Sequence, residues 1–225
     1  MVKNWKYFNK KEEIEELYID NGQYMAGNVL GIVLLENSGE YSVNSVRNAQ
    51  KYDYPVRYEV VRKNVNDSEF AIDVLQKVEE LNKQGCRGII LADEQFCRVY
   101  QQIIQNTKLL TLVSMLQIIP FAIGCINKNL KVCVVSNYGK EEVINNIKKV
   151  GLGEYLTRCI ITDSKLNDIT NINDIGCIIW DEENFDDLTN CYSEKIYKNI
   201  PIYTYVKVAK LLKMGLVQVP YEGWI

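Results

Sequence analysis

Two short acidic clusters stand at the ends of apolar runs, and they are the residues of this sequence best suited to do chemistry. GIILADEQF (88–96) contains Asp93 and Glu94, and CIIWDEENF (177–185) contains Glu182 and Glu183. Open α/β sheets bind their ligands at the carboxyl ends of the strands. Carboxyl groups at such positions can act as general acids and bases, which is the chemistry these clusters indicate.

The sequence contains no histidine, which narrows the remaining options. A Ser-His-Asp triad, a Cys-His pair and a histidine-bound zinc ion are therefore excluded. The seven cysteines form no C-x-x-C pair, which favours reduced thiols in an intracellular protein. We interpret Cys97 and Cys177 as small packed side chains rather than nucleophiles. No glycine-rich phosphate loop opens a helix, so no nucleotide cofactor is expected.

Bulk composition limits the class of partner. The chain has 225 residues, 47% of them hydrophobic, with a net charge of −3 and a pI near 5.3. Without a basic field, neither a nucleic acid nor a membrane surface is expected as a partner. The polar N-terminus does not resemble a secretory signal, so we predict a cytoplasmic protein. Polar residues, proline and glycine interrupt the apolar stretch 109–126, which favours a buried strand and a buried helix over a membrane span.

Short β-branched runs alternate with amphipathic stretches along the chain. Strands are predicted at 29–35, 56–61, 87–93, 109–113, 131–136, 158–162, 176–181 and 201–205. Apolar residues recur at helical spacing over 68–84 and 141–150, and a glycine follows each stretch. Alternating strands and helices of this kind predict an α/β fold with parallel sheets covered on both faces by helices.

Internal similarity predicts two related halves. GIVLLENSG (31–39) matches VCVVSNYG (132–139), and GIILADEQF matches CIIWDEENF. We interpret this as a duplication that gives two pseudo-symmetric lobes, each a parallel sheet flanked by helices, with the site in the cleft between them. The expected division is an N-terminal extension (1–28), a first lobe (29–113 with 206–225) and a second lobe (114–205).

Several stretches resemble the aspartate/glutamate racemase superfamily. The run GIVLLENSGEYSVNSVRNAQKYDYPVRYEVV (31–61), above all its part RNAQKYDYPVRYEVV (47–61), and VSMLQIIP (113–120) carry this resemblance, which extends from about residue 27 to about residue 214. It implies two pseudo-symmetric α/β lobes and catalysis without a cofactor. It also implies one cysteine from each lobe on either side of the substrate α-carbon, because a racemase needs two proton carriers on opposite faces of one carbon.

The resemblance places glutamates where that family has its two cysteines. ADEQF puts Glu94 at the first position and DEEN puts Glu182 at the second. A shift of one residue in the alignment would instead select Asp93 and Asp181, or Gln95 and Glu183. The alternative is that these acids are solvated, or that they cap the following helices, whose N-termini favour negative charge. We expect Glu94 and Glu182 to be the catalytic pair.

The same resemblance suggests substrate-binding residues in the loops after other strands. These are Asn37, Ser38, Ser114, Ser136, Asn137 and Glu183. Asn and Ser also favour tight turns for local reasons, so turn formation is the alternative role for most of them.

These residues together indicate a racemase-like isomerase or epimerase that uses a Glu/Glu acid–base pair. Two carboxylates beside the α-carbon repel a dianion, so a small non-dianionic substrate is expected. The same pair could serve a lyase or a hydrolase, and a protein that has lost catalysis could bind a metabolite or a protein partner. No metal or cofactor is expected, and the resemblance suggests a homodimer.

Overall fold

Eight buried, β-branched runs form parallel strands, as the sequence predicts. The computed structural model describes residues 30–36, 45–52, 54, 56–63, 66–162, 172–180 and 200–216. The first sheet contains β1 (Leu30–Leu35), β2 (Val56–Val61), β3 (Gly88–Leu91) and β4 (Leu110–Leu112). The second sheet contains β5 (Lys131–Val135), β6 (Cys159–Thr162), β7 (Ile175–Trp180) and β8 (Ile202–Tyr203).

The two sheets have the same topology. Their strand orders are β2-β1-β3-β4 and β6-β5-β7-β8, and every pairing is parallel. Strands β1 and β5 hold equivalent places, and so do β3 and β7. These are the strands in which the internal sequence matches lie, which confirms the two pseudo-symmetric lobes.

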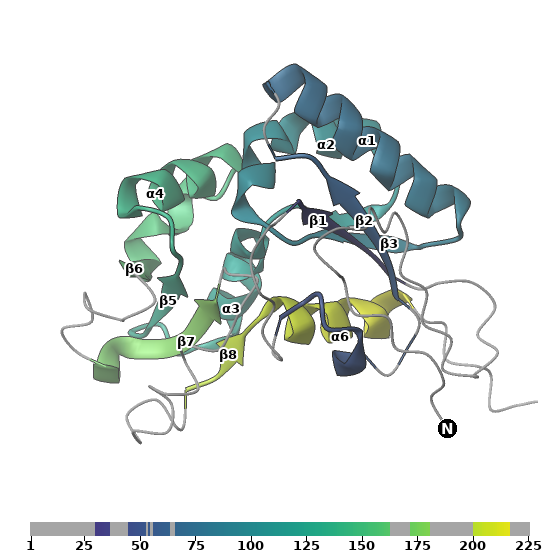
Figure 1. Cartoon of the computed structure of the whole chain (residues 1–225). Coiled ribbons are helices and arrows are strands. Elements are labelled where there is room, and N and C mark those ends of the chain that lie inside the picture. Colours follow the sequence, from purple (N-terminus) through teal and green to yellow (C-terminus); the bar gives the residue numbers. More distant parts are fainter. Residues whose placement is uncertain are drawn as a thin grey trace, which may run out of the picture.

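Helix α1 (Asp67–Lys83) covers one face of the first sheet (Figure 1). The Asn66 side chain accepts a hydrogen bond from the backbone of Glu69 and so caps the helix. The buried apolar stripe of α1 packs against β1 and β3. The packing is close, because an added Cβ at Gly31 of β1 would lie 2.7 Å from the Leu81 side chain. Gly85 ends the helix with a φ of 89°, the left-handed conformation that glycine adopts most readily.

Helix α6 (Tyr205–Leu216) runs from the end of β8 back to the opposite face of the first sheet (Figure 1). Leu216 packs directly over Gly88 of β3, and the Arg87 guanidinium lies 3.5 Å from the Leu216 carbonyl oxygen. Helix α6 therefore lies against the first sheet although it follows the second in the chain.

The stretch 109–126 forms a strand followed by helical turns, as predicted. Strand β4 leads into the 3₁₀ helix η3 (Met115–Ile118) and α3 (Ile119–Cys125). In the second lobe, α4 (Lys140–Lys149) buries Val143 and Ile147 against the sheet. None of the helices described is both long and apolar enough to cross a membrane.

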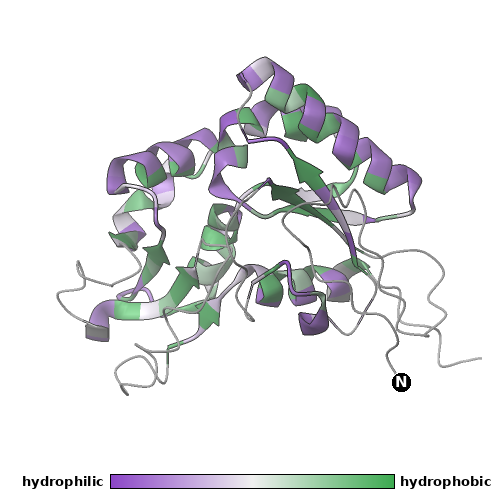
Figure 2. Cartoon of the chain, viewed as in Figure 1, coloured by the Kyte–Doolittle hydropathy of each residue, from purple (hydrophilic) through white to green (hydrophobic). Residues whose placement is uncertain are grey.

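Hydropathy follows the layers of the fold. Figure 2 shows apolar strands in both sheets and helices whose polar residues face outward. The face of the first sheet that meets α1 carries Val33, Ile89 and Leu91, whereas the opposite face joins the larger apolar cluster shared with the second lobe. Because successive side chains of a strand point to opposite faces, the first sheet separates the apolar core beneath α1 from the core shared with the second lobe.

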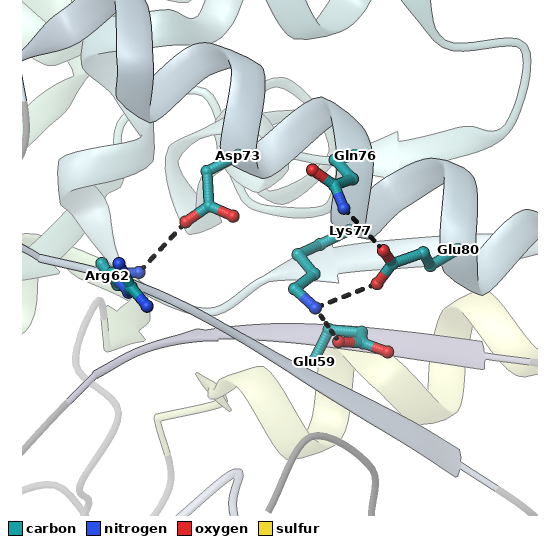
Figure 3. Close-up of polar contacts among 6 residues, drawn as sticks. All are labelled: Glu59, Arg62, Asp73, Gln76, Lys77 and Glu80. Atoms are coloured by element: carbon teal, nitrogen blue, oxygen red, sulfur yellow. Dashed lines mark hydrogen bonds and ion pairs between the residues drawn. The ribbon is translucent and has the colours of Figure 1, made fainter. Parts of the chain in front are cut away.

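A buried acid of β2 is paired beneath α1. Glu59 is 3% exposed, and its carboxylate lies 3.0 Å from the Lys77 ammonium of α1. Lys77 also contacts Glu80 at 2.9 Å, and the backbone N–H of Arg62 donates to Asp73 at 3.3 Å (Figure 3). The Glu59–Lys77 and Arg62–Asp73 contacts hold the helix against the edge strand of the sheet.

Candidate functional site

The first acidic cluster lies directly beyond β3, but the strand ends at Leu91, two residues earlier than predicted. Asp93 caps the 3₁₀ helix η2 (Glu94–Val99), because its Oδ1 accepts a hydrogen bond from the backbone N–H of Gln95 at 2.8 Å. Helix α2 (Tyr100–Asn106) continues from η2. The capping role thus belongs to Asp93, and Glu94 is the first residue of the turn.

Glu94 is buried, with 2% of its surface exposed. The Ser136 hydroxyl donates a hydrogen bond to Glu94 Oε2 over 3.3 Å. Ser136 is 1% exposed and follows β5 directly. The structure therefore joins two of the candidate residues, one from the carboxyl edge of each sheet.

A second contact between the sheets runs beside the first. The Tyr138 hydroxyl donates to Asp93 Oδ1 over 3.0 Å, and the Tyr138 backbone N–H donates to Ser136 Oγ over 3.2 Å. The sequence reasoning missed Tyr138. Its only signal was its place two residues beyond Ser136, in the turn before α4.

Burial raises the pKa values of both Asp93 and Tyr138. Desolvation raises the pKa of Asp93, and the hydrogen bonds from Gln95 and Tyr138, with the charges of Lys63 and Arg47, only partly oppose it. Desolvation, followed by the nearby charge of Asp93, raises the pKa of Tyr138. The phenol therefore stays protonated and remains a hydrogen-bond donor at neutral pH.

A buried arginine lies at the end of β1. Arg47 is 5% exposed, and its guanidinium donates to the backbone carbonyl of Leu35, the last residue of the strand. The preceding carbonyl, that of Val46, accepts hydrogen bonds from the hydroxyls of Tyr52 at 3.1 Å and Tyr58 at 2.9 Å. Since β1 pairs with β3, this anchored turn brings a cation to the strand edge that carries the acidic pair.

Ser114 and Asn137 have different surroundings. Ser114 is fully buried after β4, where its hydroxyl oxygen accepts from the Leu116 N–H at 3.0 Å and forms a capping box with Gln117. This is the local turn chemistry that the sequence offered as the alternative. Asn137 is exposed on the turn after β5.

The other four candidates, Asn37, Ser38, Glu182 and Glu183, lie outside the described residues, and so does Asp181. Their roles remain predictions. Strand β7, which precedes Glu182, ends at Trp180, and Trp180 pairs with Val135 of β5. Ser136 is the next residue after Val135.

The two cysteines singled out from the sequence, Cys97 and Cys177, are packed side chains. Cys97 and Cys177 are each 2% exposed within apolar clusters, as expected. Burial raises the pKa of Cys177 to about 11. Within the described part of the chain, no group of three or more His, Cys, Asp or Glu side chains could hold a metal ion.

The fold is similar to that of arylmalonate decarboxylase, and the predicted resemblance is confirmed at the level of fold. Unliganded arylmalonate decarboxylase is similar over 84% of this chain and 92% of its own, with a TM-score of 0.52 and 12% identity. A second crystal structure of arylmalonate decarboxylase gives the same TM-score of 0.52 over 84% of this chain and 91% of its own, again at 12% identity.

An aspartate racemase homologue from Pyrococcus horikoshii OT3 has a TM-score of 0.47 and 11% identity, over 84% of this chain and 98% of its own. No protein-family model and no curated protein sequence matches the chain. At these identities the likeness concerns the fold alone.

Proposed function

We propose that the protein is a cofactor-independent enzyme of the isomerase or epimerase type, in which Glu94 and Glu182 carry protons to and from one carbon. The observation that supports this most directly is the hydrogen bond from Ser136 to Glu94. It sets a buried carboxyl group from the carboxyl edge of one sheet against the carboxyl edge of the other. Ligands of parallel sheets bind at such edges.

The strand register supports a place for Glu182 near the same point. Trp180 and Val135 are paired, so the chain leaves β7 beside the position at which Ser136 leaves β5. Glu182 lies two residues beyond Trp180. In this proposal the two glutamates face each other across a cleft between the lobes, and the substrate lies between them.

The reaction requires only proton transfer. One glutamate, as the carboxylate, removes the proton from a carbon next to a carbonyl or imine, and the electron pair moves into that group. The other glutamate, as the carboxylic acid, returns a proton to the opposite face. Each turnover inverts the carbon and exchanges the protonation states of the two side chains, so no electron acceptor is needed.

Local charge sets the expected substrate class. One glutamate is ionised in this mechanism and Asp93 lies next to Glu94, so negative charge would lie beside the reacting carbon, and Arg47 and Lys63 oppose the charge of Asp93 only in part. At about 4 Å and an intermediate dielectric, each additional like-charge pair costs on the order of several kcal/mol. We therefore propose a small neutral, cationic or singly charged carbon acid, such as an amino acid amide, rather than aspartate or glutamate.

A lyase is the main catalytic alternative. The name arylmalonate decarboxylase describes the loss of a carboxyl group, and that protein shares this fold. In such a reaction the substrate would lose carbon dioxide, the electron pair would move into an adjacent carbonyl or aromatic group, and a glutamate in its carboxylic acid form would return a proton to the carbon. In a hydrolase, one carboxylate would activate water and the other group would protonate the leaving group. A protein without catalysis would use the same residues to bind a metabolite or a protein partner.

Incorporation of solvent deuterium tests the proposal. A panel of neutral amino acids and their amides, with aspartate and glutamate for comparison, is incubated with the protein in D₂O and followed by mass spectrometry. Wild-type protein should label at least one neutral compound, and Glu94→Gln should lower the rate about 100-fold or more for one enantiomer of that compound. Glu142→Gln, which alters an exposed acid of α4, is the matched control and should leave the rate unchanged. Equal labelling by wild-type protein and Glu94→Gln would contradict the proposal.

A further inference from the structure

We infer that Tyr138 is a positioning residue for Glu94: it holds the turn that carries Glu94 through Asp93, and it holds the Glu94 carboxyl group through Ser136. This inference rests on the proposed function, since it concerns the residue that places one member of the proposed pair. It is carried by a closed circuit of hydrogen bonds that the two sheets form together.

One side of the circuit fixes the turn that carries Glu94. Oδ1 of Asp93 accepts two hydrogen bonds, from the Gln95 N–H at 2.8 Å and from the Tyr138 hydroxyl at 3.0 Å. Gln95 follows Glu94 in the first turn of η2. A single oxygen thus ties that turn to a residue of the second lobe.

The other side of the circuit reaches the Glu94 carboxyl group itself. The Tyr138 backbone N–H donates to Ser136 Oγ at 3.2 Å, and the same oxygen lies 3.3 Å from Glu94 Oε2. A serine hydroxyl has one proton to donate. Ser136 Oγ thus accepts from the Tyr138 backbone and donates its own proton to Glu94 Oε2, which fixes the place of that carboxyl group.

Burial keeps the Tyr138 hydroxyl as the donor of its hydrogen bond to Asp93. Burial raises the pKa of Tyr138, so the phenol donates rather than accepts at neutral pH. The charged and titratable groups that act on Asp93 are Lys63, Arg47 and Tyr138, with Glu94 next to it in the chain.

The experiment compares Tyr138→Phe with Tyr155→Phe, which removes the hydroxyl of a half-buried tyrosine in the 3₁₀ helix η4 (Gly153–Arg158) outside the circuit. Side-chain carboxyl carbons of Asp and Glu are labelled with ¹³C and titrated by NMR, with Asp93→Asn and Glu94→Gln as assignment variants. Tyr138→Phe should move the Asp93 midpoint to higher pH and shift the Glu94 resonance. Tyr155→Phe should change neither. Superimposable Asp93 and Glu94 titrations in wild-type protein and Tyr138→Phe would overturn the inference.

A kinetic measurement completes the test on whichever panel compound the wild-type protein labels. Tyr138→Phe should lower kcat about tenfold or more with KM within about twofold, because misplacement of a proton carrier slows the chemical step more than binding. An unchanged kcat would contradict the positioning role. If wild-type protein labels no compound, the proposed function fails; the NMR titration would still report whether Tyr138 holds Asp93 and Glu94, which separates the two failures.

Discussion

The Lys77 ammonium of α1 lies 3.0 Å from the Glu59 carboxylate of β2, and the Glu59 side chain is 4% exposed against 19% for Lys77. Removal of one partner of a buried ion pair leaves the other charge in a poorly solvated place. Lys77→Met should therefore lower the free energy of unfolding by about 3 kcal/mol. Glu80→Gln, which alters the more exposed partner of the same lysine, should cost about 0.5 kcal/mol. Urea unfolding measures both, and equal losses would contradict the burial argument.

The close approach of α6 to β3 can be tested at Gly88. An added Cβ there meets the Leu216 side chain, so Gly88→Ala should destabilise the protein by about 1–3 kcal/mol through overpacking. Leu216→Ala should relieve the clash, so the double variant should lose less stability than the sum of the two single losses. Additive losses would show that α6 does not pack over Gly88 in solution.

Asp93 should give stability an unusual pH dependence. Its pKa is raised in the folded protein, chiefly by burial, so the folded state binds the proton more tightly than the unfolded state. Its contribution is therefore fully present below the unfolded pKa, near 3.9, and is lost as the pH rises through the folded pKa. Asp93→Asn keeps an acceptor for Gln95 and Tyr138 but does not titrate, so unfolding free energies in this window should fall less steeply with pH. Parallel curves for the two proteins would contradict this.

The thiols should differ in reactivity. Burial raises the pKa values of Cys133 to about 12 and of Cys159 to about 11, whereas Cys125 is exposed. Iodoacetamide at pH 8 should therefore modify Cys125 first among the cysteines of the described residues. Peptide mapping by mass spectrometry identifies the site, and Cys125→Ser should remove that product. Equal early modification of Cys133 would contradict its buried position.

Much of the fold could be predicted because each strand carries its own pattern. All eight predicted strands form, and the helices predicted over 68–84 and 141–150 begin and end within one residue of α1 and α4. The predicted strand runs two residues past the observed end of β3. Asp93 has the extended backbone of a strand residue, but its side chain caps η2. The bounds of helix α2 could not be predicted, because its seven residues bury only Ile103 and so carry little periodicity.

The site was less predictable because it depends on how the sheets meet. Glu94 and Ser136 could be chosen as strand-end residues, but their contact joins positions 42 residues apart in the chain. Tyr138 gave no pattern of its own, since a tyrosine in a turn is ordinary until its hydroxyl is seen to reach Asp93. Arg47 was quoted within the resemblance without a role, and only its burial beside Leu35 distinguishes it.

The opposed glutamate pair can be tested most directly by isotope exchange from each enantiomer separately. With a substrate found in the panel, Glu94→Gln should abolish proton abstraction from one enantiomer and Glu182→Gln from the other, while each variant still binds both within a few-fold of wild type. This outcome is expected because each face of the carbon is served by its own carboxyl group. If either variant exchanges both enantiomers at the wild-type rate, the two glutamates do not form the acid–base pair.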